Sequence, residues 1–277
     1  DDHQKYLLDW LPESRQWSYT LGTTFKHYGN NWYHFFVLSR SGLYNKVEKY
    51  TGNDRHNPKT IDYRSGESEN KFRFEHHRYA ANGFKLQVGA GIEYAHYDNT
   101  TARRLFAAGE AIDQYYSRAL NMWKWAVFGQ VSRSFFSERL ALSLGLRADG
   151  CNYTGKTAAL YRQISPRFSF SYAFDERWSL NGNIGRYYQL PAYTTLGFAD
   201  AGGVLVNKRN KTGYIGADHY VLGVEYRPGT TTRITLEGFY KTYDHYPVSL
   251  TDSVALANKG TDYVAVGDEV VRPVEIG

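Results

Sequence analysis

Residues 138–150 read ERLALSLGLRADG, and apolar and polar side chains alternate along almost the whole stretch. In an extended chain successive side chains point to opposite faces. One face would therefore carry Leu140, Leu142, Leu144 and Leu146. The other face would carry Ala141, Ser143 and Gly145 together with the charged Arg147 and Asp149. A strand with one purely aliphatic face and one charged face separates an apolar medium from a polar one.

The same period of two recurs along the chain. It is present in GFKLQVGAGIEYAHY (83–97), MWKWAVFGQVS (122–132), PRFSFSYAF (166–174), HYVLGVEYR (219–227) and RITLEGFYK (233–241). Segments of this kind predict antiparallel strands of about ten residues, which is the length a tilted strand needs to cross a bilayer. No segment has a helical period, so helices are expected only as single turns inside loops.

Short and long connections alternate between these segments. Short connections are predicted at 28–31, 79–83, 135–139, 174–177 and 227–231. Long connections are predicted near 42–69, 98–118, 150–163, 188–216 and 244–263. Short turns at one end and long loops at the other are typical of outer-membrane barrels.

Composition agrees with a membrane barrel but does not decide the fold class, because a soluble carbohydrate-binding sandwich could be equally rich in aromatic residues. The chain holds 25 Tyr, 15 Phe and 6 Trp but only one Cys, so no intrachain disulfide and no cysteine-based metal cluster can form. The mean hydropathy of −0.57 does not argue against membrane strands, which hide apolar residues at every second position. The net charge of +5 is spread along the chain, so no nucleic-acid partner is expected.

Aromatic residues lie where a barrel would meet the lipid headgroups. Phe135, Phe174, Trp178 and Tyr226 flank the predicted short turns, and Tyr94 lies toward a long loop. A soluble β-sandwich with aromatic ends is the alternative, but its interior would have to bury the charged face. We therefore predict an all-β fold, an antiparallel transmembrane β-barrel of which about ten to twelve strands are present.

The polar faces of these strands would line the barrel lumen. The predicted lumen-facing residues are Lys124, Gln130, Arg147, Asp149, Arg167, Glu225, Glu237 and Lys241. We expect these groups to pair with one another, or with a domain that fills the lumen, more than to contact a ligand.

The order of the segments resembles a known family. LGLRADG (144–150), ISPRFSFSYAF (164–174), WSLNGNIGRYYQLPAY (178–193), HYVLGVEY (219–226) and LEGFYKTYDH (236–245) follow one another as strands do in the middle of a TonB-dependent outer-membrane receptor of the type found in Bacteroides-like bacteria. The resemblance extends from about Arg15 to His245. Each motif is loose by itself, and their order and spacing carry the similarity.

The resemblance implies a 22-stranded barrel with an N-terminal plug domain in the outer membrane of a Gram-negative bacterium. It also implies energy-coupled uptake of a scarce ligand, such as a ferric siderophore, haem, cobalamin or a glycan, driven by the TonB complex through the plug. The sequence shows no secretory h-region, TonB box or plug, and it ends in VEIG. We therefore expect residues 1–277 to be a partial barrel domain without a plug.

A search for catalytic chemistry gives no candidate. His76 and His77 in EHHRY (75–79) would point to opposite faces of a strand, and so would the Asp–His neighbours at 218–219 and 244–245. No serine stands in a nucleophile-elbow context. We predict no catalytic residue, no metal ligand and no cofactor.

The long loop after GRYYQLPAY (185–193) is the best candidate for ligand contact. Tyr187, Tyr188 and Tyr193 would supply aromatic surfaces, and NKRNK (207–211) supplies Lys208, Arg209 and Lys211. Rings and cations together suit a planar anionic ligand such as an iron chelate or haem. The alternative is a solvated loop with interfacial tyrosines.

Two other functions remain open at the sequence level. A self-contained barrel of ten to twelve strands could be a protease or lipase, and it would show hydrolytic activity. A passive porin would show steady ion conductance in a planar bilayer.

Overall fold

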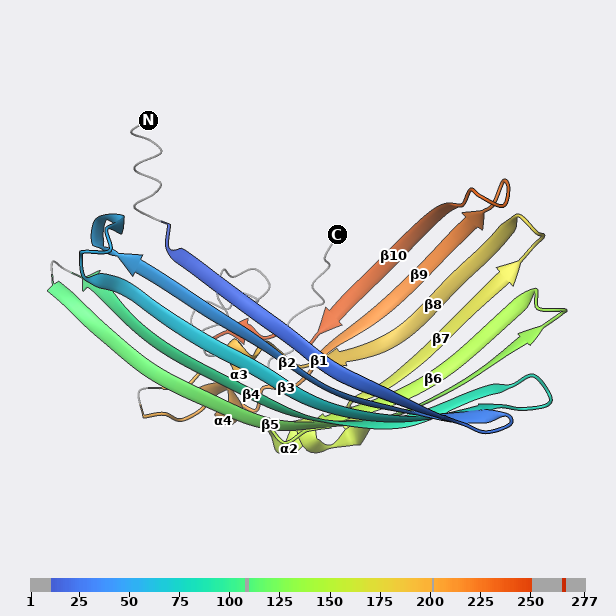
Figure 1. Cartoon of the computed structure of the whole chain (residues 1–277), viewed down its shortest axis with the longest axis horizontal. Coiled ribbons are helices and arrows are strands. Elements are labelled where there is room, and N and C mark those ends of the chain that lie inside the picture. The colour runs from blue at the N-terminus through green and yellow to red at the C-terminus, as the bar shows by residue number, and fades with distance from the viewer. Residues whose placement is uncertain (1–10, 108–109, 201, 251–265, 268–277) are drawn as a thin grey trace.

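The computed structural model describes residues 11–107, 110–200, 202–250 and 266–267. Ten of its strands form one antiparallel sheet in which each strand pairs with the next one along the chain, from β1 to β10 (Figure 1). The strands are β1 (Glu13–Tyr28), β2 (Trp32–Tyr50), β3 (Lys59–Tyr79), β4 (Lys85–Ala107), β5 (Glu110–Phe135), β6 (Leu140–Cys151), β7 (Ile164–Ala173), β8 (Trp178–Gln189), β9 (Ile215–Tyr226) and β10 (Ile234–Asp244). The curved sheet is open between β1 and β10.

Helical structure is confined to the connections, as the sequence predicts. The elements are η1 (Thr51–Asn53), α2 (Gly155–Ala158), η2 (Leu160–Arg162), α3 (Tyr193–Leu196) and α4 (Val206–Arg209). None of the helices in the described residues has the length and apolarity needed to span a membrane. A two-residue ladder, β11 (Val248–Ser249) with β12 (Val266–Gly267), completes the described elements.

All five predicted short connections are confirmed as tight turns at the same end of the sheet, on the right in Figure 1. Of the long connections, 150–163 and 188–216 are also confirmed, as the segments 152–163 and 190–214 between strands. The predicted loop 244–263 lies largely outside the described residues.

The predicted loops at 42–69 and 98–118 are wrong. Both segments are mostly strand, because β2–β3 and β4–β5 continue as long paired hairpins. Strands β6–β10 have the expected 10–12 residues, whereas β1–β5 have 16–26. Beyond a membrane both faces of a hairpin are wet, so the apolar–polar alternation disappears although the backbone ladder continues. A charged segment without alternation can therefore be a paired strand beyond the membrane.

The two faces of the sheet differ as the alternation predicts. We call the face that carries Lys124 the inner face, because the 190–214 segment packs against it. The opposite, outer face carries exposed apolar side chains on every strand from β1 to β10. Examples are Leu21, Leu144 and Leu236, with 74%, 57% and 78% of their surface exposed.

Aromatic side chains bound this apolar outer face at the short-turn end. Trp178 and Tyr226 stack with ring centroids 4.3 Å apart beside the turns. At the other end Tyr94 packs on Trp123, with centroids 4.9 Å apart. From Phe135 to Trp123 on β5 a strand tilted by about 40° rises roughly 30 Å, close to the height of an outer-membrane barrel's apolar band with its girdles.

A charged side chain introduced on this apolar band tests whether the outer face contacts lipid. Leu146→Arg in the full-length protein should lower the free energy of unfolding in a bilayer by about 2–4 kcal/mol, because Leu146 pairs with Gly129, midway between Phe135 and Trp123. Urea titration of the folded fraction measures the change. Ser117→Arg, on the outer face of β5 but beyond the Trp123 aromatic row, is the matched control and should be nearly neutral. Equal losses in the two variants would contradict the assignment.

The outer part of the β2–β3 hairpin, residues 46–62, extends beyond the apolar band and is stabilised by a cluster of ion pairs. Glu48 Oε2 lies 2.6 Å from Lys46 Nζ, Glu48 also contacts Lys59, and Lys59 Nζ lies 3.0 Å from Asp62 Oδ2. Hydrogen bonds from Lys46 and then Lys59 hold the pKa of Glu48 below its ordinary value. The hydrogen bond to Glu48 is the main cause that raises the pKa of Lys59 to about 12.

These two pKa shifts set the pH range in which the outer part of the β2–β3 hairpin is stabilised. Glu48 stabilises the folded hairpin fully above its ordinary pKa, roughly 4.3, and this contribution is lost as the pH falls through the depressed value. Lys59 contributes fully below its ordinary pKa, roughly 10.4, and this is lost as the pH rises through about 12. Amide hydrogen exchange of residues 46–62, corrected for intrinsic rates, should show both limits. In Glu48→Gln the acid limit should flatten; an unchanged acid limit would contradict this account.

Candidate functional site

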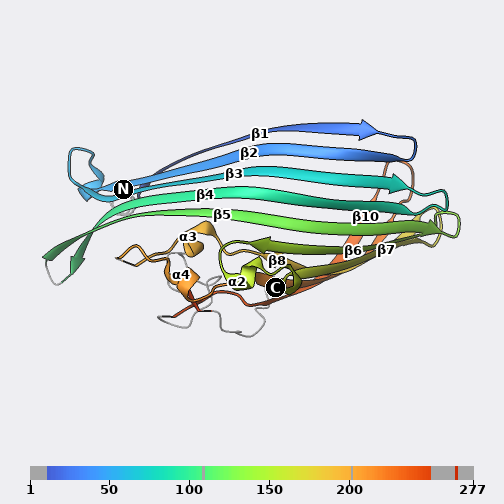
Figure 2. The same ribbon diagram turned by 90° about the horizontal axis from the view of Figure 1, so that it is seen from below.

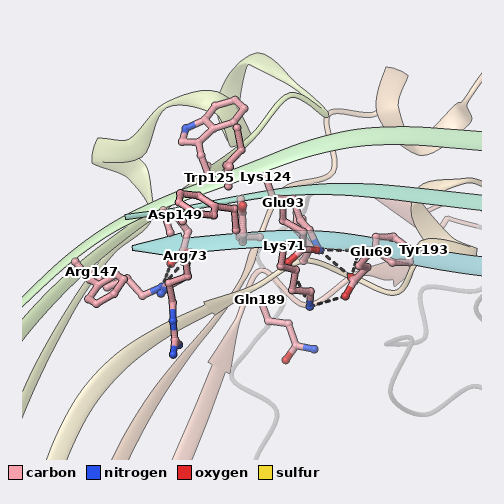
Figure 3. Close-up of a pocket in the computed structure, with 18 of the residues that line it drawn as sticks. Glu69, Lys71, Arg73, Glu93, Lys124, Trp125, Arg147, Asp149, Gln189 and Tyr193 are labelled. Atoms are coloured by element: carbon pink, nitrogen blue, oxygen red, sulfur yellow. Dashed lines mark hydrogen bonds and ion pairs between the residues drawn. The ribbon is translucent and has the colours of Figure 1, made fainter. Parts of the chain in front are cut away.

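A pocket of about 560 Å³ lies on the inner face where β3, β4 and β5 meet the 190–214 segment. Its charged and aromatic lining includes Glu67, Glu69, Lys71, Arg73, Glu93, Lys124, Phe128, Arg147, Asp149, Tyr193 and Tyr214 (Figure 3). The pocket lies level with the aromatic row of Tyr94 and Trp123, on the long-loop half of the sheet.

Strand register places alternating charges side by side in this wall. Lys71 pairs with Glu93 across β3 and β4, and Glu93 pairs with Lys124 across β4 and β5. Lys71 Nζ lies 2.5 Å from Glu69 Oε2 and 3.3 Å from Glu93 Oε2. Lys124 Nζ lies 3.0 Å from Glu69 Oε1 and also contacts Glu93. Each of these four side chains is therefore neutralised by at least one neighbour.

Tyr193 joins the 190–214 segment to this network. Its phenol donates a hydrogen bond to Glu69 and accepts one of 2.6 Å from Lys124 Nζ (Figure 3). Burial, followed by the contact with Glu69, raises the pKa of Tyr193 well above its ordinary value. The phenol thus remains protonated at physiological pH, which lets it donate to the Glu69 carboxylate.

An apolar cluster anchors the rest of the segment. Leu196 on α3 is fully buried against inner-face side chains of β4, β5 and β6 and against the 152–163 connection. The buried members are Tyr97, Leu120, Met122, Cys151, Tyr153 and Leu196. Tyr153 donates its hydroxyl to the Leu196 carbonyl over 2.8 Å, and burial raises the pKa of Tyr153. Figure 2 shows α3 and α4 on this side of the sheet, close to β5.

The pocket carries no net formal charge. Four bases line it (Lys71, Arg73, Lys124 and Arg147), and so do four acids (Glu67, Glu69, Glu93 and Asp149). Arg147 makes hydrogen bonds of 2.6–3.0 Å to Asp149, and Arg73 Nε lies 3.0 Å from Glu75. Such a wall offers donors and acceptors of both signs and does not by itself demand an anionic ligand.

A second pocket, of about 660 Å³, lies further out along β4 and β5 beside the same segment. Arg103, Asp113, Tyr116 and Arg118 are among its lining residues. Arg118 donates a 2.7 Å hydrogen bond to the Asp200 carbonyl, which ties the outer part of the segment to β5.

All eight residues predicted to face the lumen lie on the inner face. Cross-strand pairs connect them without a register shift, from Lys124 opposite Cys151 to Gly145 opposite Arg167 and Thr235 opposite Glu225. Lys124, Arg147 and Asp149 line the main pocket, whereas Gln130 lines a small one near the short turns. Glu225 pairs with Arg227 and Arg233 at 2.6 Å each. The Arg167 guanidinium lies 4.5 Å from the Tyr187 ring, and Lys241 lies 5.0 Å from the Phe239 ring.

The six predicted ligand contacts are not brought together. Tyr187 and Tyr188 belong to β8 and not to the loop, so they lie on opposite faces of the sheet. Tyr187 is on the inner face, with its ring centroid 4.6 Å from that of His219. Tyr193 lines the main pocket. Lys208 and Arg209 lie on α4 and Lys211 just after it, outside the pocket lining.

Sequence reasoning missed Glu69, Lys71, Arg73 and Glu93 as site residues. Glu93 lay on the predicted polar face of its strand, but Glu69 fell within a predicted loop. The alternation of KFRFEHH (71–77) was the available signal that β3 reaches this level. His76 and His77 do lie on opposite faces of β3, and no group of three metal-ligating side chains is found among the described residues.

Removing the Tyr193 hydroxyl should loosen the segment. In Tyr193→Phe the ion pair between Glu69 and Lys124 remains, but both side chains lose their hydrogen bond to Tyr193 on α3. A hydrogen bond to a charged group contributes about 1.5–3 kcal/mol. We expect amide hydrogen exchange of residues 192–197 to rise about tenfold or more. Tyr161→Phe removes a hydroxyl from a tyrosine that is 71% exposed and should change nothing there. Equal exchange in Tyr193→Phe and the parent would show that the tie is unimportant.

Comparison with known proteins agrees with this architecture. The family described as TonB dependent receptor-like, beta-barrel, matches residues 1–277. Comparison with curated proteins gave no significant match.

Solved structures share the fold at low sequence identity. The pyoverdine outer membrane receptor FpvA from Pseudomonas aeruginosa PAO1 is 11% identical with a TM-score of 0.64, over 95% of this chain and 41% of that chain. A ferric enterobactin receptor (PfeA) mutant from Pseudomonas aeruginosa is 17% identical with a TM-score of 0.63, over 94% and 40%. The outer membrane transporter YddB from Escherichia coli is 14% identical with a TM-score of 0.59, over 86% and 35%.

The chain thus spans well under half the length of these solved structures. The matched family, the ten-stranded antiparallel sheet and the apolar outer face agree with one another. The chain belongs to the TonB-dependent receptors, as part of their β-barrel in the outer membrane of a Gram-negative bacterium.

Proposed function

We propose that the full-length protein imports a scarce ligand across the outer membrane by energy-coupled uptake. In this proposal the ligand binds on the long-loop side of the barrel. The TonB complex then acts through a plug domain that residues 1–277 do not include, and the ligand passes through the lumen. The chain acts as a transporter and catalyses no bond chemistry.

The observation that carries the proposal is the pocket that the 190–214 segment borders on one side. It combines paired charges, aromatic rings and a segment attached to the wall by Tyr193 and the Leu196 cluster. A passive pore would have no need of a built pocket at its outer end. Membership of the receptor family supports the same conclusion.

The lining of the pocket supports one class of ligand. Balanced charges and half-buried aromatic rings suit a polar ligand with many hydrogen-bonding groups, as in a ferric siderophore, haem, cobalamin or a glycan. Three relatives in fold are named as receptors or importers of ferric enterobactin, ferric catecholate and pyoverdine. We favour an iron chelate on this ground.

Energy coupling is testable in cells that produce the full-length protein. Uptake of the radiolabelled iron chelate should fall to the background level when TonB is deleted or when a protonophore removes the proton gradient. Binding at 4 °C should remain. Uptake that persists without TonB would contradict the proposal, and steady conductance of the purified protein would favour a porin.

Two variants distinguish the predicted ligand surfaces. If the ligand is anionic and α4 contacts it, replacing Lys208, Arg209 and Lys211 by Ser should raise the half-saturating concentration for uptake at least tenfold. The maximal rate should stay the same. If the pocket is the main contact, Lys71→Gln with Arg73→Gln should have that effect instead, and the α4 variant should behave like the parent. No effect in either variant would exclude both surfaces.

A further inference from the structure

On β2 and β3 the outer face becomes polar at one row of side chains. Moving from the short turns toward the long hairpins, Leu38, Phe72 and Ile92 form a continuous apolar row across β2–β4. The next outward row holds Arg40 and Asn70, level with Tyr94 and Trp123. Arg40 therefore lies at the level where lipid chains give way to headgroups.

Two neutral neighbours hold Arg40 in place. Its Nε donates a 2.9 Å hydrogen bond to the Tyr19 hydroxyl on β1, and Nη1 donates one of 2.8 Å to Asn70 Oδ1 on β3. The Tyr19 ring occupies the space above Gly42, where a side chain would collide with it at 2.4 Å. Trp17 stacks on Tyr19 at 5.7 Å. The guanidinium is thus fixed in direction before any ligand arrives.

Arg40 has no carboxylate partner in the part of the chain that the structure describes. A guanidinium has five N–H groups, and only two of them are used by Tyr19 and Asn70. By contrast, Arg186, on the outer face of β8, contacts both Asp218 and Asp244. Three arginines of the outer hairpins, Arg55, Arg64 and Arg104, also have carboxylate partners.

An uncompensated cation at the edge of a hydrocarbon layer is stabilised by a nearby anion. The anions available at that level belong to lipid headgroups, and guanidinium binds phosphate with paired N–H groups. We propose that Arg40, held by Tyr19 and Asn70, binds the phosphate headgroup of an anionic lipid in the extracellular leaflet. The site lies on the outer face of the barrel, so it is independent of the transport pathway.

The aromatic side chains beside Arg40 fit such a partner. Trp17 stacks on Tyr44 at 4.5 Å, and both lie toward the long hairpins from Arg40 on the outer face. On the other side Tyr94 donates to Asn121 over 2.9 Å and packs on Trp123. Polar groups of Asn70, Ser68 and His96 lie between these two aromatic groups. Aromatic rings with a polar edge are typical of the membrane interface, where lipid headgroups lie on one side and acyl chains on the other.

The test uses the full-length protein purified in detergent. Lipid A, whose headgroup carries phosphates, is added, and native mass spectrometry measures the fraction of protein that retains one lipid molecule. Arg40→Gln should lower the apparent affinity at least fivefold, whereas Arg40→Lys should retain part of it. Arg64→Gln is the matched control on the outer face of β3, about 20 Å along the strand from the Asn70 row, and should bind like the parent.

Three results would overturn the proposal. The first is equal retention of lipid A by Arg40→Gln and the parent. The second is equal binding of dephosphorylated lipid A. The third is displacement of the lipid by millimolar inorganic phosphate, which would identify a general anion site in place of a lipid site. Uptake is not measured, so failure here leaves the transport proposal untouched.

Discussion

The structure depends on one constraint: in lipid, every backbone N–H and C=O must find a partner within the protein. The antiparallel ladder meets this requirement on both sides of every strand from β2 to β9, with a single register irregularity, at Lys49–Tyr50 near the end of β2. Because side chains alternate, a fixed ladder also fixes which residues face lipid. A slip of one residue would turn Leu144 inward and Arg147 outward, so register and side-chain chemistry enforce each other.

The inner wall follows from the same register. Lys71, Glu93 and Lys124 stand in one row across three strands, so opposite charges meet without any special loop. Breaking such a row would leave a charge without compensation in a partly enclosed space. The pairs therefore make the wall polar yet nearly neutral, which suits a surface that must hold a ligand or a plug and release it. Tyr193 adds a hydrogen-bonding partner from the 190–214 segment to this wall.

Much of the fold was predictable from local patterns. The alternation in 138–150 and in the other quoted segments located β4 to β10 and their faces, and all eight residues predicted to face the lumen lie on the inner face. The short turns were also found, because turn residues interrupt the alternation. The pattern failed in the outer halves of β2–β5, where water on both faces removes the need for alternation. It was also ambiguous in 31–40, where Phe35 on the inner face is covered by Lys26 and Arg73 and both faces look apolar.

By itself, the sequence determined the fold class and the membrane-facing side of the strands, because both depend on residue type at every second position. Only the tertiary structure decided which residues form the site. Glu69 and Tyr193 are 124 positions apart and meet because the 190–214 segment folds back over β3–β5. Tyr187 and Tyr188 are neighbours in the chain and separate because a strand sends them to opposite faces. Whether two residues meet or separate in this way depends on how strands pair and where a loop packs. A local sequence pattern does not contain this information.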